Sequence, residues 1–239
     1  EEPKARVRIL PDGTLDWMRG SRADIPLRTV VIEGVNITNG SIDIIDEQSG
    51  QTRQLAGLNA DLSAASLAGP WRGEGYGSLD GEEAAFTLAT GEGDAASRTM
   101  PLRLRILPDA VPAAIELDGD VVLAEDRPAY NGRFAMNALE EEDESEPVEA
   151  PPPGPRLKGS FELTNERIRI PDYRLEVGPL NNPYVVTGEA TLDTGEAPEF
   201  LLTADGQQID VNRLGEGERA KTGRDAAASA QRRIQAVID

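Results

Sequence analysis

The residue types that do most of the chemistry in enzymes are missing from this sequence. The chain contains no His and no Cys, so it lacks the commonest general base, every thiol nucleophile and the usual ligands of zinc. Its Ser residues do not lie in the Gly-x-Ser-x-Gly turn that presents a hydrolase nucleophile. We therefore predict that the chain is not an enzyme and carries no cofactor.

The carboxylates Asp43, Asp46 and Glu47 are the nearest approach to a metal site. Their spacing lacks the Asp-x-Asp-x-Asp-Gly pattern that makes oxygen ligands converge on calcium or magnesium. Asp43 is expected on the polar side of a strand, and Asp46 and Glu47 are expected to open a turn. The prediction is three solvent-facing carboxylates and no metal. The glycines at 73, 75 and 77 do not precede a helix, so we interpret them as turn or bulge glycines rather than as a phosphate loop.

Composition excludes some partners and favours a thin sheet. The net charge of −19 repels phosphate backbones, so we predict no nucleic-acid binding. The apolar residues are mainly aliphatic, with only four Phe, four Tyr and two Trp, which suits sheets with one dry face. No apolar run approaches the length of a membrane-spanning helix. The chain starts at Glu1 without an initiator Met, and we interpret it as a segment of a longer protein.

Alternating apolar residues predict the elements that would position any site. Residues 35–38 and 41–46 alternate in this way on either side of Asn39-Gly40, a dipeptide typical of hairpin turns. A similar plan, strand, turn and strand opening on Phe, recurs around Asp80-Gly81 and around Thr194-Gly195. The prediction is a mainly β chain of repeated antiparallel meanders, followed after Thr222 by a short C-terminal helix.

Changes in composition divide the chain into four parts. We predict first β units at 1–139, an acidic and proline-rich linker or loop at 140–156, a further β unit at 157–212, and a polar stretch with the helix at 213–239. The linker bears too few apolar residues to offset the entropy lost on ordering. A solvated linker is the main interpretation of it, and an acidic docking peptide is the alternative.

Two blocks of this sequence resemble the AsmA family of bacterial envelope proteins. The first is the run Val35-x-Ile37-x-Asn39-Gly40-Ser41-Ile42-x-Ile44-x-Asp46-Glu47, continued by Leu55-x-Gly57-Leu58 and by Ser66 to Trp71. The second extends from Gly159 to Gly206, with Phe161, Leu163, Ile168, Ile170 and the run Phe200-Leu201-Leu202. The similarity is clearest over residues 27–90 and 159–211, and its motifs belong to the scaffold rather than to a catalytic centre.

The resemblance implies a fold, a location and a function. It implies a curved, elongated, groove-like sheet with an apolar inner face, related to bridge-like lipid-transfer proteins. It also implies a periplasmic body held in the inner membrane by a segment not present here, which moves phospholipid toward the outer membrane or assists outer-membrane biogenesis. The expected partners are phospholipid or another acyl-chain lipid and neighbouring segments of the same protein.

The residues expected to line such a groove are the apolar members of the alternating strands. They are Val35, Ile37, Ile42, Ile44, Phe86, Leu88, Leu102, Leu104, Ile115, Leu117, Val121, Leu123, Phe134, Met136, Phe161, Leu163, Ile168, Ile170, Leu175, Val177, Phe200 and Leu202.

Two other functions remain open at this point. Alternating strands fit a closed sandwich as well as an open groove, so a structural or assembly scaffold with a closed core is the alternative. An enzyme on a β scaffold is the third hypothesis, and no residue in the sequence supports it.

Overall fold

The structure is a computed structural model that describes residues 2–16, 31–66, 69–94, 96–125, 127–139, 154–193 and 198–206. As predicted, these residues are mainly β, and they form one sheet. Its strands are β1 (Lys4–Ile9), β2 (Ile32–Asp46), β3 (Thr52–Ala64), β4 (Trp71–Leu79), β5 (Glu82–Thr90), β6 (Thr99–Pro108), β7 (Ala113–Ala124), β8 (Arg127–Ala138), β9 (Arg156–Leu163), β10 (Arg167–Val177), β11 (Tyr184–Asp193), β12 (Glu199–Leu202) and β13 (Asp205–Gly206).

The strands follow one another across the sheet in chain order. Each strand from β2 to β12 is antiparallel to the next, whereas β1 lies parallel to β2 and β13 pairs with β11. The meander predicted from the sequence is therefore confirmed. The described sheet is open rather than closed into a barrel, because β1 and β12 stand at its two ends.

The Asn39-Gly40 hairpin is a wrong prediction. Residues 35–38 and 41–46 belong to one long strand, β2, and both parts pair with β3. Asn39 has a φ of 50° and its backbone N–H donates to the side chain of Asn59, so the ladder is interrupted there without a reversal. Gly57 in β3 also has a positive φ, of 60°. Asn39 adopts the left-handed conformation expected of it, but in a bulge that bends the strand.

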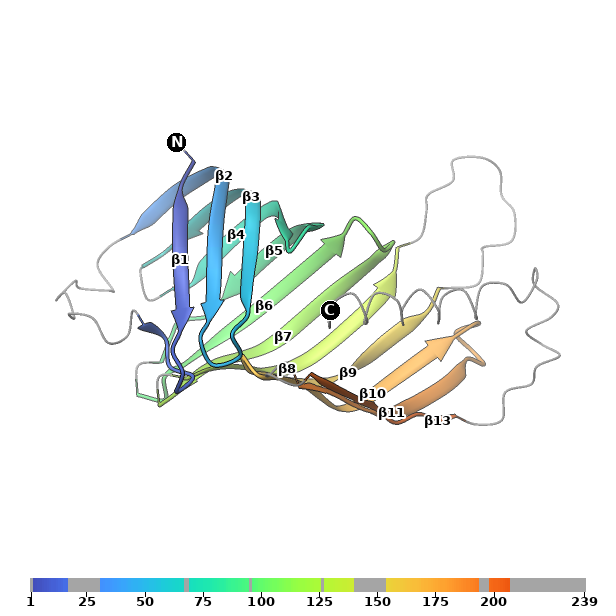
Figure 1. Cartoon of the computed structure of the whole chain (residues 1–239). Helices are drawn as coiled ribbons and strands as arrows, with labels where there is room; N and C mark the ends of the chain where they lie inside the picture. Colours follow the sequence, from blue (N-terminus) through green and yellow to red (C-terminus); the bar gives the residue numbers. More distant parts are fainter. Residues whose placement is uncertain are drawn as a thin grey trace, which may run out of the picture.

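The bend divides the sheet into a front and a back part. In Figure 1, β1 and the second half of β2 stand in front of β5 and β6, with the first half of β2 running behind. The turn predicted at Asp80-Gly81 is confirmed: both residues have positive φ and join β4 to β5 through the pair Leu79 and Glu82. The sheet therefore curves around a space rather than lying flat.

Few side chains are fully enclosed in this sheet. Phe161 is the largest buried hydrophobic residue at 4% exposure, and most of the other buried hydrophobic residues are alanines. None of the described large side chains falls below 2% exposure. A sandwich of two packed sheets would enclose such side chains, so the described residues do not form a closed core.

Three predicted features fall wholly or partly outside the described residues, and the turn at Thr194-Gly195 is one of them. The acidic and proline-rich run 140–153 connects β8 to β9, and these strands pair along their length, with Tyr130 opposite Leu163. The sheet therefore continues directly from the first predicted β unit into the second. The predicted C-terminal helix lies beyond residue 206, where the description ends. In the described part of the chain, no helix is long and apolar enough to cross a membrane.

Candidate functional site

Strand register aligns apolar side chains into rows that cross the sheet. Residues directly opposite each other on paired strands share a face, as do residues two apart on one strand. The first row, which crosses β2 to β11, contains Val35, Leu62, Gly73, Leu88, Leu104, Leu117, Phe134, Gly159, Tyr173 and Gly188.

Two further rows lie on the same face. The second contains Ile37, Ala60, Gly75, Phe86, Ile106, Ile115, Met136, Leu157, Leu175 and Val186. The third, from β6 to β12, contains Met100, Val121, Tyr130, Leu163, Ile168, Leu192 and Phe200. We call the surface made by the three rows the apolar face.

The register places the predicted lining residues on this face. Fourteen of them are members of the three rows. The others extend it by alternation or by pairing: Ile42 opposite Leu55, Ile44 opposite Arg53, Leu102 opposite Gly119, Leu123 opposite Pro128, Phe161 opposite Gly132, Ile170 and Leu202 opposite Ala190, and Val177 opposite Tyr184.

Several members of the rows were not predicted from the sequence. The pairing of their strands with neighbouring strands is what places Leu62, Leu157 and Val186 on the apolar face. Ile106 continues the alternation of Leu102 and Leu104 and could have been found from that signal alone. The tyrosines and glycines of the rows carry no apolar signal, so only the register identifies them.

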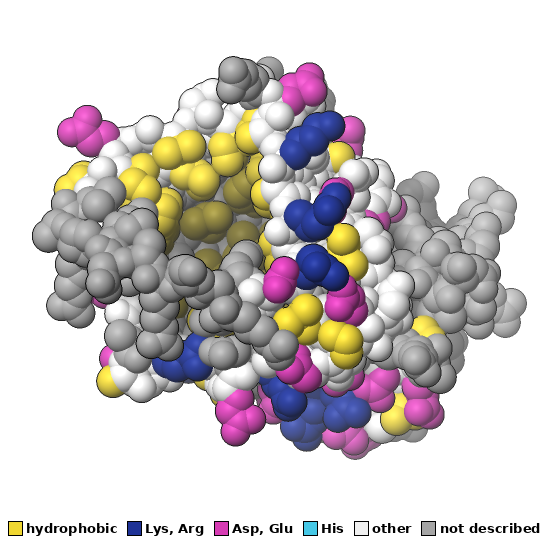
Figure 2. Space-filling view, turned by 60° about the vertical axis from the view of Figure 1, so that its left-hand side comes forward, with side chains coloured by type: hydrophobic (Ala, Val, Ile, Leu, Met, Phe, Trp, Pro, Cys, Tyr) yellow, Lys and Arg dark blue, Asp and Glu magenta, His cyan; other side chains and the backbone are white. Residues whose placement is uncertain are grey.

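The apolar face borders an open hollow. Figure 2 shows hydrophobic side chains gathered along the walls of a hollow in the surface. Val35 is 42% exposed, Ile168 37% and Phe200 42%, while Leu88, Leu104 and similar residues are half-buried. Phe161 differs from them: it is buried, with its ring 4.8 Å from that of Tyr130 in an edge-on arrangement. Most predicted lining residues are thus accessible, whereas Phe161 packs inside the sheet against Tyr130.

Glycines within the rows are covered by large neighbours. A Cβ at Gly73 would lie 2.4 Å from Leu62 Cδ2, and one at Gly159 would lie 2.9 Å from Phe134 Cε1. Likewise, a Cβ at Gly188 would lie 2.9 Å from Tyr173 Cε1. Side chains on adjacent strands therefore lean over these glycines, as aromatic residues often do in curved sheets. The apolar face therefore remains continuous at the positions where glycines allow the sheet to curve.

The two tyrosines of the rows use their hydroxyl protons in hydrogen bonds to the backbone. Tyr130 donates to the carbonyl of Leu102 at 2.9 Å, and Tyr173 donates to the carbonyl of Thr203 at 2.8 Å. Burial, with smaller effects of Asp118 and Asp120, raises the pKa of Tyr130 from 10.0 to about 12. Both hydroxyls fasten neighbouring parts of the sheet together.

The raised pKa of Tyr130 makes a pH-dependent prediction. Because the phenol loses its proton more readily in the unfolded chain, its contribution to stability is complete below pH 10.0 and is lost as the pH rises through about 12. Tyr130→Phe should remove the last tyrosine to ionise in an ultraviolet titration and lower the free energy of unfolding by about 1 kcal/mol at neutral pH. A wild-type titration that is complete at the ordinary tyrosine pKa would contradict this assignment.

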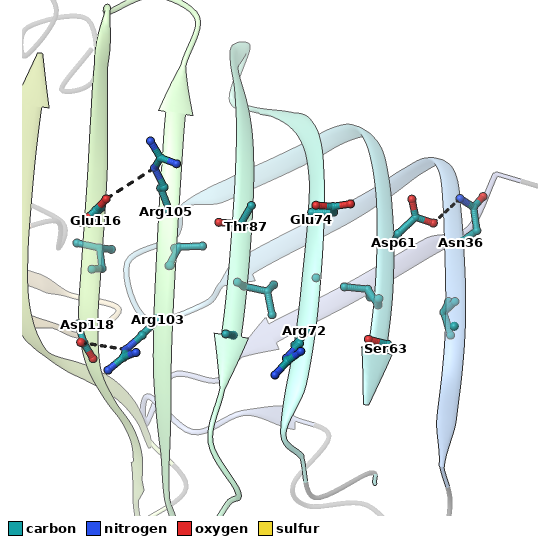
Figure 3. A pocket seen from close by; sticks show the side chains of 18 of the residues that line it. Asn36, Asp61, Ser63, Arg72, Glu74, Thr87, Arg103, Arg105, Glu116 and Asp118 are labelled. Carbon is teal, nitrogen blue, oxygen red and sulfur yellow. Dashed lines mark hydrogen bonds and ion pairs between the residues drawn. The ribbon is translucent and has the colours of Figure 1, made fainter. Parts of the chain in front are cut away.

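The opposite face of the same strands is charged. Figure 3 shows Asn36, Arg72, Thr87 and their polar neighbours over a trough of about 900 Å³. Arg103 pairs with Asp118 at 3.0 Å and Arg105 with Glu116 at 3.7 Å, all four being well exposed. Exposed ion pairs of this kind contribute little to stability. Together they keep this face solvated.

The carboxylates considered for metal binding are held by the chain's own donors. Asp43 accepts from the Gln54 amide at 3.1 Å, and Glu47 pairs with Arg8. The prediction that all three face solvent is wrong for Asp46, which is 7% exposed. Asp46 accepts from the Gln48 backbone at 2.9 Å and from the Ser49 hydroxyl at 2.7 Å, because it organises the turn between β2 and β3. In the described ranges no cluster of His, Cys, Asp or Glu has an arrangement suited to a metal ion.

Comparison of the chain with protein-family models, with curated protein sequences and with solved structures finds no match.

Proposed function

We propose that this chain shelters the acyl chains of lipid in the groove bordered by its apolar face. The observation that carries the proposal is a continuous hydrocarbon surface on an open sheet, with its tyrosine hydroxyls already bonded to backbone carbonyls. A surface of this kind recognises the apolar part of a ligand and makes few demands on its head group.

The length of the rows suits this function. The first row crosses from β2 to β11, and strands spaced by ~4.8 Å give it a path of roughly 40 Å. The hydrocarbon core of a whole bilayer is ~30 Å thick, so lipid tails can lie along the row. Each methylene left in water costs about 0.8 kcal/mol, and two long tails would cost on the order of 20 kcal/mol. A long dry surface is therefore what a lipid carrier requires.

The setting that we propose is a bacterial envelope protein of the AsmA type. In that setting the chain is a periplasmic segment of a protein anchored in the inner membrane, and the groove carries phospholipid between the inner and outer membranes. The sequence motifs around residues 35–71 and 159–206 support this setting. A groove without a polar clamp would let a lipid slide along it, as transfer requires.

Native mass spectrometry of the chain purified from bacterial cells tests this function. We expect a fraction of the protein to carry the mass of a phospholipid, and this mass should disappear after delipidation and return when phospholipid vesicles are added. A chain that never carries lipid and does not bind a hydrophobic dye would favour a structural or assembly scaffold instead.

A further inference from the structure

Two side-chain contacts join parts of the sheet that are far apart in strand order. Arg127 Nε, at the start of β8, donates to the carbonyl of Asp12, which follows β1, at 2.9 Å. Asn165 Nδ2, in the turn between β9 and β10, donates to Gln48 Oε1, in the turn between β2 and β3, at 3.0 Å. We call Asp12, Gln48, Arg127 and Asn165 the seam. It brings the ends of β1 and β2 against the start of β8 and the turn between β9 and β10.

The seam is closely packed at its centre. Gly13 is buried and has a φ of 79°, and a Cβ there would lie 3.0 Å from Gln48 Oε1 and 3.6 Å from Arg127 Cδ. Ile9 and Leu15, which form a bridge beside it, are 8% and 7% exposed. The seam therefore combines the buried residues Ile9, Gly13 and Leu15 with polar side chains that reach solvent.

The seam differs from the rest of the wall in how it is held. Neighbouring strands of the described sheet are joined by ladders of backbone hydrogen bonds. The described hydrogen bonds across the seam involve side chains, and no strand pairing joins its two sides. The Arg127 bond is exposed and the Asn165 bond is part-buried. Water can replace side-chain bonds of this kind at little loss, whereas opening a strand ladder would break several backbone bonds together. The seam is thus a place where the curved wall can separate without breaking a strand ladder.

We propose that the seam is a latch that opens to admit an acyl chain sideways into the groove. This inference rests on the proposed function, because a long tail must enter a groove either through an end or through its side. With the latch closed, the first strands meet the ends of β8 to β10 and close one side of the hollow. With the latch open, the tail can enter along its whole length without threading.

Cross-linking across the latch tests this proposal, and the absence of Cys from the natural sequence makes the chemistry specific. The full chain carrying Gln48→Cys and Asn165→Cys is joined by a short, reducible thiol cross-linker. The rate at which the fluorescent fatty acid cis-parinaric acid enters is then measured by stopped flow. We expect entry to slow about tenfold or more in the cross-linked protein, and to recover after reduction. Arg103→Cys with Asp118→Cys, joined in the same way on the charged face, should leave the rate unchanged.

A second variant opens the latch instead of closing it. Gln48→Ala with Asn165→Ala removes the amide contact, and we expect faster entry with unchanged strand content by circular dichroism. Equal entry rates in the cross-linked, reduced and alanine proteins would overturn the latch while leaving lipid binding intact. Failure of the unmodified chain to bind cis-parinaric acid at all would overturn the proposed function and the latch with it.

Discussion

Leu88→Glu is expected to weaken lipid binding, whereas Thr87→Glu is expected to preserve it. The two residues are neighbours on β5, but Leu88 belongs to the first apolar row and Thr87 lies on the charged face between Glu74 and Arg105. The same carboxylate is therefore added at adjacent positions on opposite faces of one strand. At position 88 it lies on the apolar face, where the proposed lipid tail would bind, and at position 87 it joins other solvated charges.

The size of the effect follows from burial. A fully sheltered Leu side chain contributes about 1.5–3 kcal/mol of apolar contact, and a desolvated carboxylate adds a further penalty. We expect the lipid affinity of Leu88→Glu to fall by about tenfold or more, as measured by titration with a fluorescent fatty acid. Thermal unfolding of both variants provides the control for folding. Equal affinities in two folded variants would contradict the assignment of the apolar face.

Gly119→Val is expected to destabilise the sheet, whereas Gly34→Val is expected to be tolerated. A Cβ at Gly119 would lie 2.0 Å from the carbonyl oxygen of Asn131 and 2.7 Å from Gly132 Cα on the paired strand β8. Both neighbours are backbone atoms, so the strands themselves must separate. Gly34, also within a strand, has no heavy atom within 4 Å of its Cβ position.

Urea unfolding measures the difference between these variants. We expect Gly119→Val to lose about 3 kcal/mol or more of unfolding free energy, at the upper end of overpacking effects. Gly34→Val should change stability by less than about 1 kcal/mol, since a strand glycine already carries an entropic penalty. A Gly119→Val protein as stable as the wild type would mean that β7 and β8 do not approach as closely as described.

Sequence patterns predicted which side chains share a face more reliably than which strands pair. Alternation along Leu102, Leu104 and Ile106 depends on each residue's own strand, so the face is visible locally. The Asn39-Gly40 prediction failed because positive φ is needed both in a hairpin turn and in a bulge within a long strand. Only the partner, β3 on both sides of the bend, distinguishes the two cases, and the partner lies elsewhere in the chain.

The row residues that the sequence did not predict were missed for the same reason, because their positions depend on other strands. Gly73, Gly159 and Gly188 belong to the wall because Leu62, Phe134 and Tyr173 on adjacent strands lean over them. Asp46 is buried because the turn after it donates hydrogen bonds back to its carboxylate. The seam was likewise invisible from the sequence, since Gln48 and Asn165 are polar turn residues whose contact arises from the curvature of the whole sheet.

Cysteine scanning along β6 is the most direct test of the lipid groove. Single cysteines are placed at each position from 102 to 106 in the otherwise Cys-free chain, and their reaction with a water-soluble maleimide is timed with and without phospholipid vesicles. We predict that lipid protects positions 102, 104 and 106, which lie on the apolar face, and leaves 103 and 105 equally reactive. Protection that is absent, or that shows no alternation along the strand, would contradict the proposal that lipid occupies the groove.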